Sequence, residues 1–242
     1  MACKLEINTK RLENAVLRVC QELISSGFSP KDWQDCSEEN LFNELASCLL
    51  GSRVPFEIAT GATSHLFSFG YLRPDCVLNS PDEFENSISV SLSEYRVSSE
   101  GHYFGRKYPF PRIRANYLRR SAEALYCNGR SLKQILSNCL DAHDARRNLV
   151  NLLTGIGPKQ ASLFLRNIGY SDDLAILDSH VMSYLEYKGL LSENRIKVNS
   201  LPGYEKVERV FCDHAHCLGF LVAQFDLAVW VVMRVAKREI VT

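Results

Sequence analysis

Residues 152–169 read Leu152-Leu-Thr-Gly-Ile-Gly-Pro-Lys-Gln-Ala-Ser-Leu-Phe-Leu-Arg-Asn-Ile-Gly169. An apolar helix is expected to end near Leu153, followed by a tight turn through Gly155 and Gly157. Glycine suits such a turn because it adopts positive φ and lets another backbone come close. Pro158 suits the first turn of a second helix, where its missing N–H removes no hydrogen bond. The stretch therefore predicts a helix-hairpin-helix whose second helix presents unpaired amides, a site for an anion such as a DNA phosphate.

Apolar residues at helical spacing continue on both sides of this hairpin. Further helices are expected over residues 5–25, 40–50, 56–69, 116–125, 132–140, 145–153, 179–188, 204–218 and 222–238. Residues 79–97 are expected to be helix and loop, although the alternation in Ser87-Ile-Ser-Val-Ser-Leu imitates a strand. The prediction is an all-α fold of two helical lobes with a cleft between them. Lobe A covers about residues 26–130, and lobe B covers about residues 1–25 plus 131–242, including the hairpin.

Composition limits the kind of protein this is. The 242 residues are 46% hydrophobic, which suffices for a sizeable core in one large domain or two lobes. The formal net charge is +0, so any footprint for nucleic acid must be local. Nine scattered cysteines, an odd number, indicate reduced thiols in a cytoplasmic protein. The first ten residues are polar and mixed, and no apolar run of about 18 residues predicts a membrane span.

The run Cys212-Asp-His-Ala-His-Cys217 contains four residues of the kind that bind metals. On a helix, however, only residues three or four apart share a face, so these four side chains do not converge. We therefore expect no metal here and no cofactor elsewhere in the chain.

Residues 102–120 contain no acidic residue and interleave basic with aromatic side chains. The members are Arg106, Lys107, Arg112, Arg114, Arg119 and Arg120, with Tyr103, Phe104, Tyr108, Phe110 and Tyr117. Such interleaving suits a nucleic-acid surface, so we expect Arg112 and Arg114 to contact DNA phosphates. A charged helix face with a few core aromatics is the alternative interpretation.

The hairpin and the run Ala175-Ile-Leu-Asp-Ser-His180 together resemble the helix-hairpin-helix DNA glycosylases, whose signature joins a Gly/Pro hairpin to an aspartate. The similarity is strongest to the archaeal-type 8-oxoguanine DNA glycosylase/AP lyase family, over roughly residues 41–237. Asp178 follows Lys159 by 178 − 159 = 19 residues, and Phe225-Asp-Leu-Ala-Val-Trp230 comes later in matching order. The resemblance implies an enzyme that binds double-stranded DNA and holds a flipped, modified base in the cleft between its lobes.

Lys159 and Asp178 are the catalytic residues that the resemblance implies. An unprotonated lysine amine can attack C1′ of the sugar and leave a Schiff base, which permits strand cleavage by β-elimination. A carboxylate at Asp178 would stabilise positive charge on the sugar or move protons for the amine. The alternatives are a solvated surface lysine and an ordinary N-cap aspartate.

The resemblance also implies a base pocket, in which Phe110 and Trp230 stack on the flipped base and Asp226 binds the base or caps a helix. Arg53 stands where relatives carry a small amide residue that fills the hole left in the duplex. Ile113 stands where the family usually has a lysine, which bears on the Phe110 contact. Two departures concern the choice of base: Arg53 itself, and a chain that continues to Thr242 where the family reads 8-oxoguanine partly through a C-terminal lysine. The expected DNA contacts are Arg53, Arg112, Arg114, Gly155, Gly157 and His180.

These features predict a monomeric DNA N-glycosylase with AP lyase activity, located in the cytoplasm or on the nucleoid. The first candidate for the excised base is 8-oxoguanine. Within the same class, the alternative is excision of a hypermodified cytosine of phage DNA, glycosylated or hydroxymethylated, in antiviral defence. An alternative of another class is a non-catalytic helix-hairpin-helix DNA-binding module. The register of Lys159 with Asp178 argues against that module, because phosphate binding alone requires neither residue.

Overall fold

The computed structural model describes residues 9–26, 32–191 and 198–241. Within those ranges the chain consists of helices and connecting loops, and its one β-type pairing is an isolated bridge between Arg96 and Lys107. The all-α prediction is therefore confirmed. Residues 79–97 also follow their prediction, since most of them form α5 (Pro81–Glu94) and the alternating serines do not make a strand.

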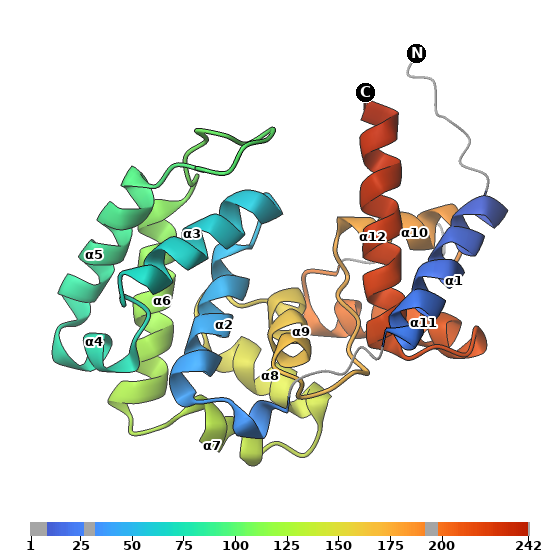
Figure 1. The fold of residues 1–242 in the computed structure, drawn as a ribbon. Helices are drawn as coiled ribbons and strands as arrows, with labels where there is room; N and C mark the ends of the chain where they lie inside the picture. Colours follow the sequence, from blue (N-terminus) through green and yellow to red (C-terminus); the bar gives the residue numbers. More distant parts are fainter. Residues whose placement is uncertain (1–8, 27–31, 192–197, 242) are drawn as a thin grey trace. The chain divides into compact units, whose positions relative to one another are not determined.

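The contacts divide the chain into two units (Figure 1). Residues 31–168 form one, here called the hairpin unit, and residues 1–30 with 169–242 form the other, here called the terminal unit. This division differs from the predicted lobes, which placed the hairpin with the C-terminal residues. The reason is packing: α9 (Pro158–Asn167) lies against α2 (Glu38–Leu50) and α8 (Ala142–Leu152), all within residues 31–168.

Local capping chemistry sets where the helices of the hairpin unit begin. Ser37, Ser131 and Asp141 each accept a backbone N–H at a helix start, as short polar side chains at N-caps do. Proline occupies the first turn of α4, α5, α6 and α9. Besides α2, α5, α8 and α9, the unit contains η1 (Trp33–Asp35), α3 (Phe56–Ser68), α4 (Pro74–Asn79), α6 (Pro111–Ala122), the π-helix η2 (Glu123–Cys127) and α7 (Leu132–Ser137). The sequence did not predict α4, and it placed the start of α6 at residue 116.

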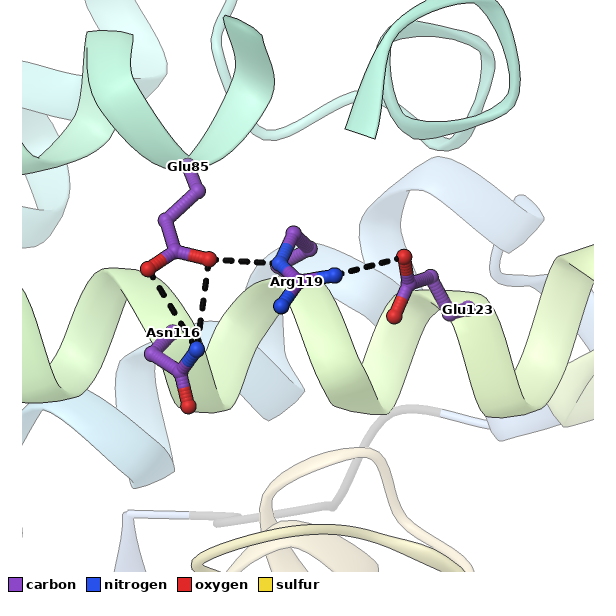
Figure 2. A network of polar contacts seen from close by, with 4 residues as sticks. All are labelled: Glu85, Asn116, Arg119 and Glu123. Atoms are coloured by element: carbon purple, nitrogen blue, oxygen red, sulfur yellow. Dashed lines mark hydrogen bonds and ion pairs between the residues drawn. The ribbon is translucent and has the colours of Figure 1, made fainter. Parts of the chain in front are cut away.

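A polar network holds α6 against α5 (Figure 2). The Glu85 carboxylate accepts hydrogen bonds from the Asn116 amide, at 3.2 and 3.3 Å, and from Nε of Arg119. Nη1 of Arg119 also donates to Glu123 at 2.8 Å, one helical turn further along. Arg119, one of the basic residues expected to face nucleic acid, is therefore engaged by two carboxylates. The network helps to fix the helix that carries Arg114 and Tyr117.

The terminal unit packs around an apolar core of aromatic and aliphatic side chains, among them Tyr184, Phe211 and Phe225. Its helices are α1 (Thr9–Ser25), α10 (Ser179–Tyr187), α11 (Leu201–Cys217) and α12 (Val222–Val241). The first of them, α1, and α10 both pack against α12. These helices match the predicted ones closely, except that residues 5–8 of the first prediction lie outside the described residues.

Among the described helices, no single one is long and apolar enough to cross a membrane. The pair α11 and α12 reaches that length and hydropathy only together, across a bend of 98°.

Candidate active site

The hairpin closes on Gly155, whose φ of +80° belongs to the left-handed region. A Cβ at this position would lie 2.2 Å from Cδ2 of Tyr117, a residue of α6. Gly157 differs, since it is extended at φ −99° and ψ 178° and acts as the N-cap residue of α9. Only Gly155 therefore needs the conformational freedom that the sequence suggested for both glycines. Ser121 of α6 secures the preceding residue, accepting from N of Thr154 at 3.1 Å.

Substituting Gly155 by Ala is expected to destabilise the hairpin unit more than the same change at Gly129. Both glycines have positive φ, and an alanine there costs about 1–2 kcal/mol. Gly129 has no atom within 4 Å of the added Cβ, whereas Gly155 would also have to displace the Tyr117 ring. Urea unfolding of the two variants measures the difference in free energy of unfolding. Equal losses would mean that the contact between Tyr117 and the hairpin contributes nothing.

Lys159 lies in the first turn of α9 and is half-buried. Among the described residues, no hydrogen bond or ion pair engages its ammonium group. Cys48 of α2 is close enough to feel the charge of Lys159, but burial and the Glu44 carboxylate raise the pKa of this thiol well above its ordinary value. Cys48 therefore stays a neutral thiol. A neutral thiol is a poor nucleophile, because the reactive form of cysteine is the thiolate. A nucleophilic role of the Lys159 amine stays a prediction.

The remaining predicted residues of the hairpin unit fall into an exposed and a buried group. Arg53 and Arg112 are exposed, and Phe110 is 38% exposed at the N-cap of α6. Arg114 is only 7% exposed, and its Nη2 donates to the carbonyl oxygen of Ser52 at 2.6 Å. This burial does not fit the predicted phosphate contact, so we revise the interpretation of Arg114 to a residue that braces the backbone at Ser52.

In the terminal unit, Asp178 is the N-cap of α10, as predicted. Its Oδ1 accepts the amides of His180, at 2.8 Å, and Val181, at 2.9 Å. One oxygen thus performs the whole capping function, and among the described residues Oδ2 has no hydrogen-bond partner. The capping and catalytic interpretations are therefore compatible, because the second oxygen is left for a proton or a developing positive charge.

The extended backbone before Asp178 is held by three buried side chains. The amide of Ala175 donates to Oε1 of Glu208 at 3.1 Å, and the amide of Ile176 donates to Oδ2 of Asp226. The hydroxyl of Tyr204 accepts from the amide of Leu177 at 3.1 Å and donates to the carbonyl of Ala175 at 2.7 Å.

This arrangement changes the interpretation of Asp226. The residue is 2% exposed and its Oδ2 receives a backbone amide, so it supports the backbone that leads to Asp178. A contact between Asp226 and a base stays a prediction. Glu208 and Tyr204 support the same backbone, and neither contact was predicted from the sequence. The signal was an acid at Glu208 on the apolar side of a predicted helix, since a buried carboxylate needs hydrogen-bond donors.

Trp230 is half-buried on α12, so it is not a core tryptophan. The guanidinium of Arg234 lies 4.8 Å from the Trp230 ring centroid. The ring of His180 stands edge-on, with centroids 6.3 Å apart and an interplanar angle of 80°. The terminal unit thus gathers His180 and Trp230 into one cluster at the start of α10. Stacking of a base on Trp230 stays a prediction.

The Cys212–Cys217 run has local partners of its own. Cys212 donates to the carbonyl of Asp173, and burial raises the pKa of its thiol to about 12. His214 shares a hydrogen bond of 3.1 Å with the Tyr184 hydroxyl, and burial lowers its pKa. These contacts give Cys212 and His214 a structural role in the terminal unit.

Comparison with known proteins bears on this arrangement. A family model described as 8-oxoguanine DNA glycosylase matches residues 27–220, which include the hairpin, Lys159 and Asp178. This chain belongs to the 8-oxoguanine DNA glycosylase family. The match includes Phe110 and ends before Asp226 and Trp230, the other two residues of the predicted base pocket.

Other members of the family extend the comparison. The 8-oxoguanine DNA glycosylase/AP lyase of Saccharolobus solfataricus is 36% identical over 196 residues, covering 80% of this chain and 82% of the relative. The solved 8-oxoguanine DNA glycosylase of Thermotoga maritima has a TM-score of 0.70 and 28% identity, covering 92% of this chain and 93% of the other.

A second glycosylase structure shows the shared fold. It is the Methanocaldococcus jannaschii 8-oxoguanine glycosylase/lyase in complex with a 15mer DNA containing 8-oxoguanine. Its TM-score is 0.63 at 23% identity, covering 90% of this chain and 88% of that one.

Proposed function

We propose that this chain is a DNA N-glycosylase with associated AP lyase activity, which extrudes a modified base from duplex DNA and excises it. The first candidate substrate is 8-oxoguanine, the base in the names of its curated relatives. The observation that carries the proposal is Lys159, a half-buried amine without a hydrogen-bond or ion-pair partner among the described residues. Its place directly after a Gly-Ile-Gly-Pro hairpin puts it beside free helix-terminal amides, which suit a DNA phosphate.

In the proposed reaction, the unprotonated amine of Lys159 attacks C1′ of the target nucleotide. A nitrogen–C1′ bond forms as the glycosidic bond breaks, and the base leaves with the bonding electron pair and takes up a proton. Opening of the sugar ring then gives a Schiff base between the lysine and C1′. Loss of a proton from C2′ breaks the C3′–oxygen bond, and the strand is cleaved.

Asp178 has the second role in this proposal. The free Oδ2 is a carboxylate oxygen that can accept a proton, or stabilise positive charge on the sugar as the base departs. Its other oxygen is fixed by two backbone amides, so the carboxylate is oriented before DNA arrives. Preorientation of this kind avoids a reorganisation cost at the moment of reaction.

The test is single-turnover incubation with duplexes that carry 8-oxoguanine, hydroxymethylcytosine, glucosylated hydroxymethylcytosine or no modification. Released base is measured by chromatography, and strand cleavage by denaturing gel electrophoresis. We expect release of 8-oxoguanine followed by cleavage at the same position. Release of a modified cytosine alone would keep the mechanism and replace the substrate. Binding without release on every duplex would contradict the enzyme and favour a DNA-binding module.

A further inference from the structure

We infer that Arg114 is a positioning residue: it holds the turn that carries Arg53 in the shape that base extrusion requires. The inference rests on the proposed function, because it concerns the step in which the target base leaves the duplex. The turn, defined here as Gly51–Val54, joins α2 to α3.

Arg53 is strained. Its φ is +61°, and among the described residues it is the only one other than glycine with a positive φ. Such a conformation costs free energy in any residue with a Cβ, and it persists only where the surroundings impose it. The side chain of Arg53 is nevertheless exposed, so its own packing cannot be what imposes the conformation. The conformation must therefore be imposed by bracing through the neighbouring backbone, where the amide of Val54 also donates to the carbonyl of Gly51 at 3.3 Å.

Three side chains from the hairpin unit supply that bracing. The buried hydroxyl of Tyr108 donates to the carbonyl of Leu50 at 2.7 Å, at the end of α2. Nη2 of Arg114 donates to the carbonyl of Ser52 at 2.6 Å, one residue before Arg53. Nε2 of Gln160 donates to the Ser52 hydroxyl at 3.0 Å. The turn is therefore fixed from α6 and from α9 at the residue that precedes the strained one.

The surroundings of Arg114 indicate that this position needs an arginine for its hydrogen bond to Ser52 and not only for packing. Its guanidinium lies between aromatic rings, 5.7 Å from the Phe110 centroid and 5.6 Å from the Tyr117 centroid. Its buried Nε has no hydrogen-bond partner. Burying a cation with an unsatisfied N–H is costly, so a helix needing only an apolar contact would be better served by leucine or methionine.

Gln160 connects the same turn to the proposed nucleophile. It follows Lys159 directly on α9, and its hydrogen bond reaches Ser52 across 108 residues of sequence. Arg53, Ser52 and Lys159 thus belong to one braced assembly within the hairpin unit. A displacement of the turn would move Arg53, while Lys159 would stay fixed by α9.

A displaced turn should therefore affect base excision and strand cleavage differently. Base excision needs extrusion of the base, whereas strand cleavage at a preformed abasic site has no base to extrude. We expect Arg114→Met to lower the single-turnover rate of base excision by about 100-fold, as misplaced positioning groups do. Strand cleavage at a preformed abasic site needs no extrusion, so its rate should stay close to that of the wild type. Arg114→Lys keeps a cation and a donor and should recover part of the loss.

Two further variants decide whether Arg114 acts through Arg53. Arg53→Gly removes the side chain while glycine adopts the same positive φ without strain. In that background Arg114→Met should slow excision little further, because the effects of two residues that act through one element are not additive. Arg119→Met is the matched control: it removes a partly buried arginine from the same helix but touches Glu85 and Glu123, not the turn (Figure 2).

The outcomes separate the inference from the proposed function. Equal losses of excision and abasic-site cleavage, additive effects with Arg53→Gly, or the same loss in Arg119→Met would each overturn the positioning role. Circular dichroism monitors folding, and Arg114→Lys provides the same comparison if the methionine variant does not fold. A wild-type protein that neither excises a base nor cleaves abasic DNA would overturn the proposed function itself.

Discussion

Lys159→Gln is expected to abolish both base release and strand cleavage while the variant still binds duplex DNA. Glutamine cannot form the bond to C1′, so neither the glycosylase nor the lyase step can begin. The fold should be unaffected, because no hydrogen bond or ion pair of the described residues involves this side chain. Reduction with borohydride in the presence of substrate measures the chemistry directly, since it traps the Schiff base as a covalent protein–DNA adduct. The wild type should form the adduct and the variant should not.

Lys107→Gln is a suitable control for this experiment. It removes one positive charge from an exposed site in the same unit and leaves the hairpin untouched. Its DNA affinity should fall slightly and in a salt-dependent way, as for the loss of one phosphate contact, while trapping continues. An adduct formed by Lys159→Gln would show that another amine is the nucleophile. The hairpin would then keep only its phosphate-binding role.

The features that the sequence predicted correctly depend on neighbouring residues. Pro158 at the start of α9 and Asp178 at the N-cap of α10 follow from rules that operate within one helical turn. The long helices follow from apolar periodicity for the same reason. The start of α6 was missed by the periodicity, although Pro111 gives the same signal as Pro158.

The sequence did not reveal the contacts of charged residues whose partners are distant along the chain. Arg114 bonds to Ser52, 62 residues away, and Asp226 receives the amide of Ile176, 50 residues away. Arg114 lies in a pattern that fits a nucleic-acid surface or a charged helix face, and Asp226 lies in an apolar helix where it was expected to bind a base or cap. Burial decides between these readings, because a buried charge must be hydrogen-bonded. That burial arises only when the helices pack, so spacing along the chain does not reveal it.

The same difference explains why Gly155 and Gly157 look alike in sequence and differ in structure. Gly155 meets Tyr117 of α6, a contact that no local pattern encodes, while Gly157 is an extended N-cap. The hairpin was recognisable from its own residues. The reason for its first glycine lies in another helix.

Asp178→Asn is expected to lower the rate of base excision by about 100- to 10,000-fold, the range for loss of a general acid–base group or of a charge-stabilising group. Asparagine still accepts the amides of His180 and Val181 through its carbonyl oxygen, so the cap persists and stability should change by less than about 1 kcal/mol. The substitution replaces the free carboxylate oxygen by an amide nitrogen that cannot accept a proton. Single-turnover excision and thermal melting, measured on the same preparation, separate the two effects.

Asp141→Asn makes the comparison specific, because Asp141 is also an N-cap aspartate and holds the amide of Asp144 at 2.7 Å at the start of α8. Both variants should fold and melt close to the wild type, since asparagine caps a helix about as well as aspartate. Only Asp178→Asn should lose excision. Should the two variants retain equal activity, Asp178 would be reduced to a cap, and charge stabilisation would have to come from another group. Should Asp178→Asn melt much lower than Asp141→Asn, its lost activity would reflect the backbone held by Glu208, Tyr204 and Asp226 and not the chemistry of the carboxylate.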